Sequence, residues 1–219
     1  MKDLATLKAI LKEAKKELTE NEDTRKNAHE NMRKATSLSK RAILLIHQKR
    51  AEEARKLVDN AKEIISNLQE LANNSPDLVY GGMFSAALQE YSEANIFLIL
   101  VEQGRFIEPK EISVPPIDYI LGLADVVGEY RRLALDVLRE GLVGKGEKCL
   151  KIMDEIYIEL MAIDEAYMLV PGLRRKCDVA RRIIETTRGD ITQEVRRKSL
   201  EDYLKRFEQT QKRRPTSKS

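Results

Sequence analysis

Residues 116–132 read PIDYILGLADVVGEYRR, the longest sequence motif of the chain. Apart from its charged residues it is almost entirely apolar, so a helix formed here would have little polar surface and would be buried. Pro115 and Pro116 stand at its start, where the first proline ends the preceding segment and the second suits a first helical turn. The stretch therefore predicts a long, packed helix from about residue 116 to 140.

Two pairs of carboxylates interrupt apolar segments at helical spacing. Asp125 and Glu129 are four residues apart in the stretch above, and Glu90 and Glu93 are three apart in QEYSEAN, residues 89–95. Residues three or four apart project from one side of a helix, so each pair is aligned by its own helix. If two helices bring the pairs together, four carboxylates form a site for a divalent metal ion.

An exposed, solvated face is the commoner explanation for such pairs in a charged helical chain. Asp125 differs because its neighbours are apolar, and Gly122 and Gly128 allow another backbone or a ligand to approach closely. Mg²⁺ takes oxygen ligands and joins a few carboxylates to substrate phosphate, which would indicate phosphodiester chemistry. A di-iron bundle would need Glu-x-x-His pairs, and the two histidines, His29 and His47, are not placed in that way.

The rest of the chain also has a helical pattern. With 34% charged and 42% hydrophobic residues but only 10 Gly and 6 Pro in 219 residues, the composition favours long amphipathic helices over sheets. We expect an all-α fold, a single-domain bundle of about seven helices over residues 1–207. Residues 208–219 have nothing to bury and are expected to form a disordered basic tail. The periodic helical segments are 2–20, 23–49, 51–73, 76–102, 147–165, 173–187 and 192–207.

The first of these segments carries one apolar stripe. Leu4, Leu7, Leu11 and Leu18 recur at intervals that place them on one side of a helix, with Ile10 beside them. The stripe is predicted to be buried against another helix.

Charge and cysteine content restrict the kinds of partner. The formal charge of +3 is the difference between 39 basic and 36 acidic residues, so only a local basic patch would attract nucleic acid. The most hydrophobic run, residues 94–101, is too short to span a membrane, and the first residues contain no apolar signal core. Cys149 and Cys177 have neither zinc spacing nor a secreted disulfide pattern. We expect a soluble cytoplasmic protein with no membrane partner.

At the acidic motifs the sequence resembles the translin/TRAX family, and its TRAX branch in particular. The resemblance rests on residues 84–94, with the core QEYSEA, and on PIDYILGLADVVGE at residues 116–129. The second motif follows the family's Pro-Val-Asp-Tyr-Leu-Leu-Gly-Val-Ala-Asp-Leu-Thr-Gly-Glu signature nearly throughout, and weaker agreement covers most of the chain. The segment from Glu102 to Pro115 lacks the long insertion of animal TRAX proteins, as in a compact archaeal-type homologue.

The resemblance implies a hollow octamer and Mg²⁺-dependent endoribonuclease activity, with Mn²⁺ as an alternative ion. Glu90, Glu93 and Asp125 align with the family's metal-binding catalytic acids, and Glu129 aligns with the fourth acid beside them. We therefore predict a homo-oligomer, an octamer by resemblance, that cleaves single-stranded RNA or RNA with single-stranded regions. Single-stranded DNA is a second candidate ligand. The alternative is a catalytically silent scaffold of translin type that binds RNA or single-stranded DNA.

A ribonuclease needs cations along the path of its substrate, because phosphate neutralisation supplies much of the affinity. One candidate set shares a stripe on the segment 23–49, a second follows Glu129 directly, and a third belongs to a basic cluster near residue 175. A solvated face is the commoner explanation for the first set, and the third would equally suit subunit contacts. The predicted RNA-binding residues are Arg33, Ser37, Arg41, Arg131, Arg132, Arg174 and Arg175.

Overall fold

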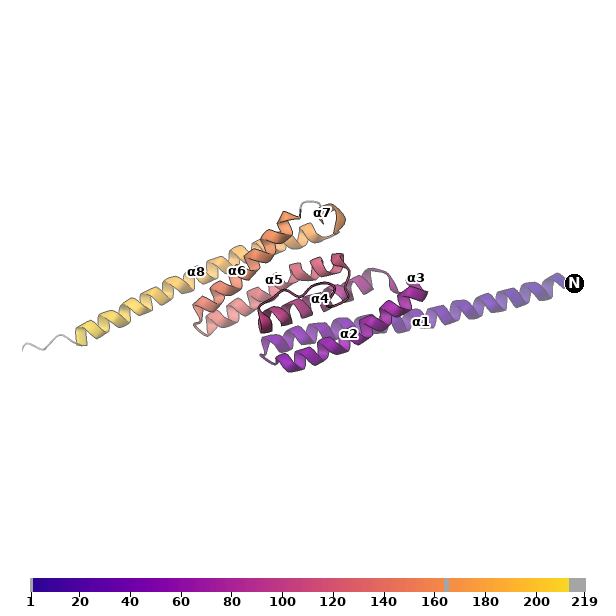
Figure 1. The fold of residues 1–219 in the computed structure, drawn as a ribbon, viewed down its shortest axis with the longest axis horizontal. Helices are drawn as coiled ribbons and strands as arrows, with labels where there is room; N and C mark the ends of the chain where they lie inside the picture. The colour runs from indigo at the N-terminus through magenta and orange to yellow at the C-terminus, as the bar shows by residue number, and fades with distance from the viewer. Residues whose placement is uncertain (1, 164–165, 213–219) are drawn as a thin grey trace, which may run out of the picture. The chain divides into compact units, whose positions relative to one another are not determined.

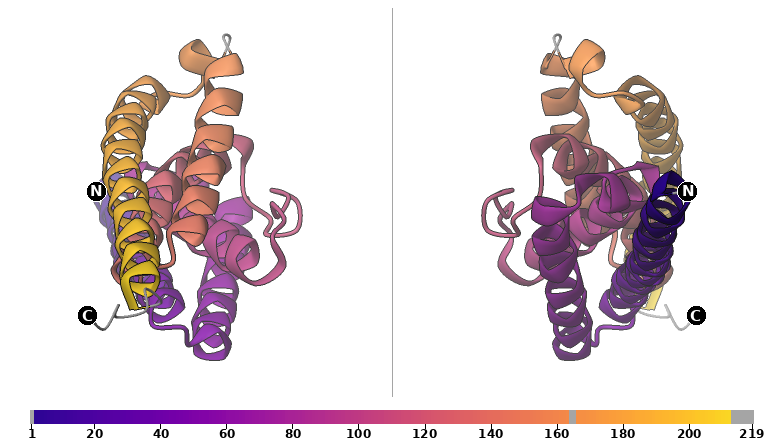
Figure 2. Two further views of the ribbon diagram at one scale, coloured as in Figure 1. Left: turned by 90° about the vertical axis from the view of Figure 1, so that its left-hand side faces the viewer. Right: turned by 90° about the vertical axis from the view of Figure 1, so that its right-hand side faces the viewer.

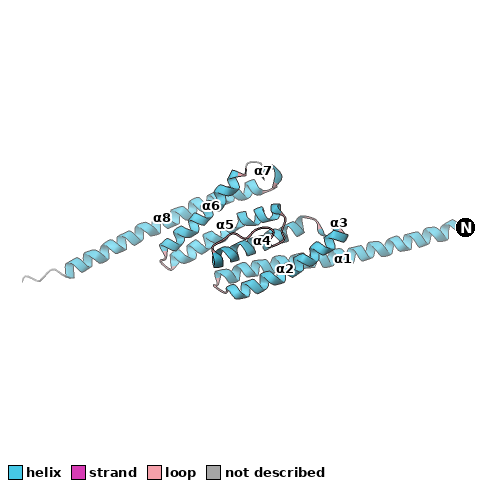
Figure 3. Cartoon of the chain, in the orientation of Figure 1, coloured by secondary structure: helices cyan, strands magenta, loops and turns pink. Residues whose placement is uncertain are grey.

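The computed structural model describes residues 2–163 and 166–212 of the chain. These residues form helices joined by turns and loops, with no strand among them (Figure 3). The predicted all-α class is confirmed. The chain forms two compact units, Met1–Leu123 and Ala124–Ser219, and the boundary falls within helix α5 (Pro116–Arg139). The single domain predicted over residues 1–207 stays a prediction.

The first unit is built on three long helices, α1 (Lys2–His47), α2 (Ala51–Asn74) and α4 (Gly82–Gln103), with the short α3 (Pro76–Val79) between the last two. Helices α1 and α2 lie side by side, and α4 packs against both (Figures 1 and 2). The buried residues of α2 recur at intervals of four and three, which gives that helix one core face. Helix α4 is more enclosed, since every residue from 91 to 100 is buried.

Helix α1 corrects two predictions. The segments 2–20 and 23–49 are one continuous helix, because the polar residues between them include no Gly or Pro to end it. The apolar stripe predicted to be buried is exposed, from 51% at Leu7 to 69% at Leu18. Among the residues of α1 whose burial is described, the first buried one is Ala28, and the earlier turns of the helix run on past α2 (Figure 1).

The second unit contains the end of α5 followed by α6 (Val143–Ala162), α7 (Ala166–Leu169) and α8 (Leu173–Lys212). Helices α6 and α8 lie side by side (Figures 1 and 2). The buried residues of α8 recur at helical spacing from Leu173 to Ile191 and form its core face.

Helix α8 joins the predicted segments 173–187 and 192–207 into one helix. Gly189 lies between them without ending the helix, since a glycine inside a helix costs only about 1 kcal/mol relative to alanine. The helix also continues through residues 208–212, where the disordered tail was predicted to begin, while residues 213–219 lie outside the described part of the chain. None of the described helices combines the length and the apolar character needed to cross a membrane.

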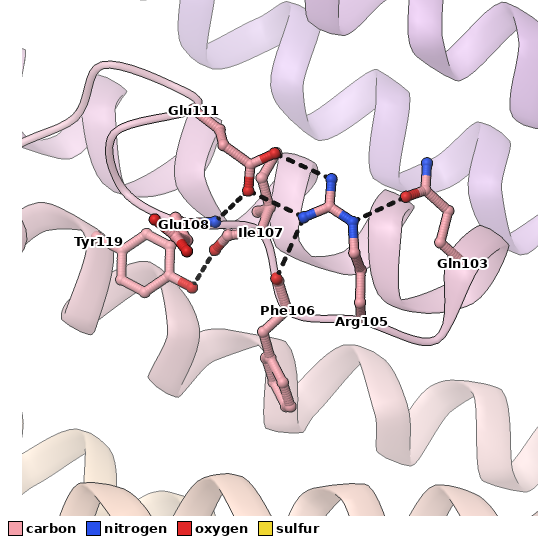
Figure 4. A network of polar contacts seen from close by, with 7 residues as sticks. All are labelled: Gln103, Arg105, Phe106, Ile107, Glu108, Glu111 and Tyr119. Carbon is pink, nitrogen blue, oxygen red and sulfur yellow. Dashed lines mark hydrogen bonds and ion pairs between the residues drawn. The ribbon is translucent and has the colours of Figure 1, made fainter.

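A polar network fixes the loop between α4 and α5 (Figure 4). The guanidinium of Arg105 donates to both carboxylate oxygens of Glu111, at 2.9 and 3.0 Å, and the backbone amide of Glu108 donates to the same carboxylate at 2.7 Å. Arg105 and this amide lower the pKa of Glu111 to about 2. The hydroxyl of Tyr119 donates to the carbonyl of Ile107 at 2.6 Å, which ties the loop to the first turn of α5.

Candidate functional site

Helix α5 begins in close contact with α4, and Gly122 makes that contact sterically feasible. A Cβ atom at Gly122 would lie 2.7 Å from the carbonyl oxygen of Gln89, 2.7 Å from Cβ of Ser92 and 3.0 Å from the backbone nitrogen of Glu93. These atoms belong to the helix backbone or are fixed to it, so they cannot move aside cheaply. The close approach predicted at Gly122 is confirmed. At Gly128 a Cβ would meet no atom within 4 Å among the described residues.

Asp118 holds the start of α5 against α4. Its carboxylate is only 7% exposed and accepts hydrogen bonds from the hydroxyl of Ser85 and, at 3.5 Å, from the side-chain amide of Gln89. Burial of a carboxylate is costly without such donors, and the first turn of a helix also favours a negative charge. Sequence reasoning missed this role, although a lone acid in the first turn of an apolar helix was a usable signal.

Glu90 and Glu93 project from α4 in the first unit. Glu93 is buried, with 8% of its surface exposed. The side chain of Glu90 is 27% exposed and forms an ion pair with Lys40 of α1, whose Nζ lies 3.2 Å from Oε1 of Glu90. The predicted acids of α4 are therefore held near the packed interior, and one of them is already neutralised by a lysine.

A basic cavity of about 610 Å³ lies beside this ion pair, between α1 and α4. The three residues of α1 predicted to contact RNA, Arg33, Ser37 and Arg41, all line it. Lys40, which forms the ion pair with Glu90, also lines the cavity. The other lining residues are Thr36, Leu44, Met83 and Ala86.

Asp125 and Glu129 lie on α5 in the second unit. Asp125 forms an ion pair with Lys176 of α8, and its side chain is 38% exposed. A cavity of about 300 Å³ opens at this pair and is lined by Asp125, Gly128, Arg175 and Lys176 together with apolar residues of α5 and α8. Arg175, predicted to contact RNA, is thus placed beside a predicted metal ligand. Glu129 is half-buried one turn further along α5.

The remaining predicted RNA contacts have different surroundings. Arg131 donates to the hydroxyl of Thr187 at 2.7 Å and pairs with Asp190 at 3.3 Å, and these contacts join α5 to α8. An RNA phosphate would have to exchange with these partners. Arg132 and Arg174 are exposed. All seven RNA contacts stay predictions.

The four predicted metal ligands are divided between the units, with Glu90 and Glu93 in the first and Asp125 and Glu129 in the second. Among the described residues, no three His, Cys, Asp or Glu side chains gather into a group that could hold a metal ion. The donor chemistry suits Mg²⁺, since all four predicted ligands are carboxylates, and two of them already face a cationic lysine. The metal site stays a prediction.

Comparison with known proteins identifies the family. Residues 23–187 match the model of the Translin family, and because this is well over half of the sequence, the chain belongs to that family. An uncharacterized protein of Methanocaldococcus jannaschii is 36% identical over 128 residues. That match covers 58% of this chain and 57% of the M. jannaschii protein, so it spans little more than half of either.

Solved structures agree in fold. A complex of AfC3PO with duplex RNA superposes with a TM-score of 0.74 at 34% identity, over 84% of this chain and 95% of the other. The crystal structure of AfC3PO gives a TM-score of 0.75 at 34% identity, over 84% and 96%. Apo-NeC3PO gives 0.77 over 84% and 96%, but at 22% identity it shows the fold alone. The predicted translin-like fold and family are confirmed.

Proposed function

We propose that this protein is a Mg²⁺-dependent endoribonuclease that cleaves single-stranded RNA or RNA with single-stranded regions. The observation that carries the proposal is the basic cavity between α1 and α4, one of whose lining residues, Lys40, is paired with Glu90 of the acidic pair. Arginines beside carboxylates suit a phosphodiester substrate that needs both phosphate contacts and a metal ion. Family membership supports RNA as the substrate, since AfC3PO has been solved with duplex RNA.

The proposed ligands of the ion are Glu90, Glu93 and Asp125, with Glu129 as the fourth acid. When bound, Mg²⁺ or Mn²⁺ would supply positive charge against the phosphate and lower the pKa of an attacking water. Glu129 either completes the ligand set or orients this water and accepts its proton. Arg33 and Arg41 would hold the substrate phosphates beside Glu90. The retained acids support a TRAX-like subunit.

Cleavage of labelled single-stranded RNA in the presence of Mg²⁺ tests the proposal. We expect Glu93→Gln and Asp125→Asn each to reduce the rate by about a hundredfold or more, because a ligand or a base of the reaction is lost. Glu102→Gln on α4 and Asp136→Asn on α5 are matched controls. Each control removes an ion-paired carboxylate from the same helix, with Arg55 and Arg139 as the respective partners, and should retain activity.

Full cleavage by Glu93→Gln and Asp125→Asn would refute the site assignment. Binding of RNA without any cleavage would favour the scaffold of translin type. In such a scaffold the ion pairs of Lys40 with Glu90 and of Lys176 with Asp125 would have a structural role only. Parallel assays with duplex RNA and single-stranded DNA would define the substrate, and a structure with Mn²⁺ would show whether the two acidic pairs hold one ion.

We also propose that the chain assembles into a hollow homo-oligomer, with an octamer as the expected size. Support comes from large apolar side chains left exposed on the early turns of α1 and the late turns of α8, since extensive exposed apolar surface is typical of an interface. The expected location is the cytoplasm, where buried thiols such as Cys149 and Cys177 stay reduced. Light scattering that gave only a monomer would contradict the assembly.

A further inference from the structure

Two lysines are paired with acids of the proposed metal site. Nζ of Lys40 lies 3.2 Å from Oε1 of Glu90, and Lys176 is paired with Oδ2 of Asp125. The lysines come from different helices, α1 and α8, and each neutralises one of the proposed ligands. A partly buried carboxylate that awaits a cation is more stable with a counter-charge in place, and each of these two acids has one within its own unit.

A lysine and a divalent ion compete for the same carboxylate. Mg²⁺ binds an oxygen at about 2.0–2.1 Å, and two cations sharing one carboxylate repel each other strongly over such distances. An ammonium on a flexible four-carbon stem can move away from the carboxylate. The pair of Lys40 is inexpensive to exchange, because its side chain is 62% exposed and exposed pairs contribute little.

Each lysine lines a cavity that also contains arginine side chains. Lys40 lines the cavity of about 610 Å³ with Arg33 and Arg41, and Lys176 lines the cavity of about 300 Å³ with Arg175. An ammonium displaced from its carboxylate would therefore add to an existing cluster of cations. Such a cluster attracts phosphate.

We infer that Lys40 and Lys176 are resident counter-cations of Glu90 and Asp125, respectively. A divalent ion displaces each lysine from its carboxylate, and the freed lysine then binds a phosphate of the RNA. The inference rests on the proposed function and adds that metal binding and RNA binding are coupled. Metal binding frees the lysines for RNA, and RNA binding draws the lysines away from the carboxylates, so each ligand strengthens the binding of the other.

Binding of Mn²⁺, followed by electron paramagnetic resonance without RNA, tests the competition. Lys40→Met and Lys176→Met should each bind Mn²⁺ about two- to fivefold more tightly than the natural chain, the range expected when a partly exposed ion pair is removed. Arg41→Met and Arg175→Met are the matched controls. They remove a positive charge from the same cavities, but no ion pair joins either arginine to the four acids among the described residues, so a smaller effect is expected.

Binding of an uncleavable 2′-O-methyl RNA with and without Mn²⁺ tests the coupling. In the natural chain Mn²⁺ should tighten RNA binding. This gain should shrink in each lysine variant and disappear in the variant that carries both substitutions. The arginine variants should weaken RNA binding equally with and without the ion. In the natural chain, the ¹³Cε signals of Lys40 and Lys176 should shift on addition of Mg²⁺, a measurement that needs no variant to fold.

The outcomes separate this inference from the proposed function. Three results would overturn the inference and leave the metal site standing. The first is an unchanged Mn²⁺ affinity in both lysine variants, and the second is an unchanged gain in RNA affinity on addition of Mn²⁺ to the lysine variants. The third is that the ¹³Cε signals of both lysines stay in place on saturation with Mg²⁺. If the natural chain binds no Mn²⁺, or if Glu93→Gln and Asp125→Asn bind it as well as the natural chain does, the proposed metal site fails and the inference fails with it.

Discussion

At Gly122, atoms of α4 lie so close to the backbone of α5 that there is no room for a side chain. We expect Gly122→Ala to lower the free energy of unfolding by about 1–3 kcal/mol, because its Cβ would press on the backbone of α4 near Gln89 and Glu93. Urea unfolding followed by circular dichroism measures the change.

Gly128→Ala is the control for this substitution, since it lies on the same helix and its Cβ would meet no described atom within 4 Å. It should stabilise the protein by about 0.5–1 kcal/mol through helix propensity alone. If the two variants had the same free energy of unfolding, the close contact between Gly122 and α4 would be contradicted.

The residues of the candidate site differ in how far sequence could predict them. Glu90, Glu93, Asp125 and Glu129 stand out because helical spacing and a long motif mark them. Lys40 and Lys176 could not be assigned to Glu90 and Asp125, because each pair joins residues far apart in the sequence. Pairing of that kind follows from tertiary packing and leaves no local pattern.

At the scale of elements, the loop between α4 and α5 depends on the ionised carboxylate of Glu111. Its pKa of about 2 lies below the ordinary value of 4.5, so the folded state favours the charged form. This contribution to stability is complete above about pH 4.5 and is lost as the pH falls towards 2.

We therefore expect Glu111→Gln to be less stable than the natural chain at pH 6, and the difference between them to shrink between pH 4.5 and 2. Urea unfolding at several pH values measures this difference. Glu108→Gln is a suitable control, because the hydrogen bond of Glu108 to Glu111 is made by its backbone amide, which the substitution keeps. A difference that stayed constant down to pH 2 would contradict the assigned role of the carboxylate.

The helices show which features of the fold a sequence can specify. Apolar residues at intervals of three and four correctly indicated the helical segments, since that periodicity is the geometry of a helix face. The ends of helices were less predictable, because polar residues between segments neither require nor forbid a break. The exposed stripe on α1 shows a second limit of prediction from sequence. The pattern from Leu4 to Leu18 indicates an apolar helix face, but it does not show which surface packs against that face.

At the scale of the whole molecule, apolar surface remains at both ends of the described chain. In α8, Leu200, Tyr203, Leu204 and Phe207 are at least half exposed. Leu200 follows the buried Ile191 by about two and a half helical turns, so it faces the opposite side of the helix. A helix that packs on the core side of α8 cannot cover this stripe, which supports a second copy of the chain as the cover.

The stripe on the early turns of α1 gives the sharpest test of assembly. A leucine buried in an interface contributes about 1.5–3 kcal/mol, and a lysine in its place would bring an unpaired charge into that interface. We expect Leu11→Lys to lower the assembled mass measured by light scattering at micromolar concentration. Helix content should not change, because Leu11 is 60% exposed within the single chain.

Ala9→Lys is the matched control for Leu11→Lys. It adds one lysine to the same exposed part of α1, but a separation of two residues places Ala9 on the opposite side of the helix from Leu11. The control should keep the mass of the natural assembly. If both variants assemble like the natural chain, the early turns of α1 do not form the interface. If both dissociate, added charge rather than loss of the stripe explains the effect.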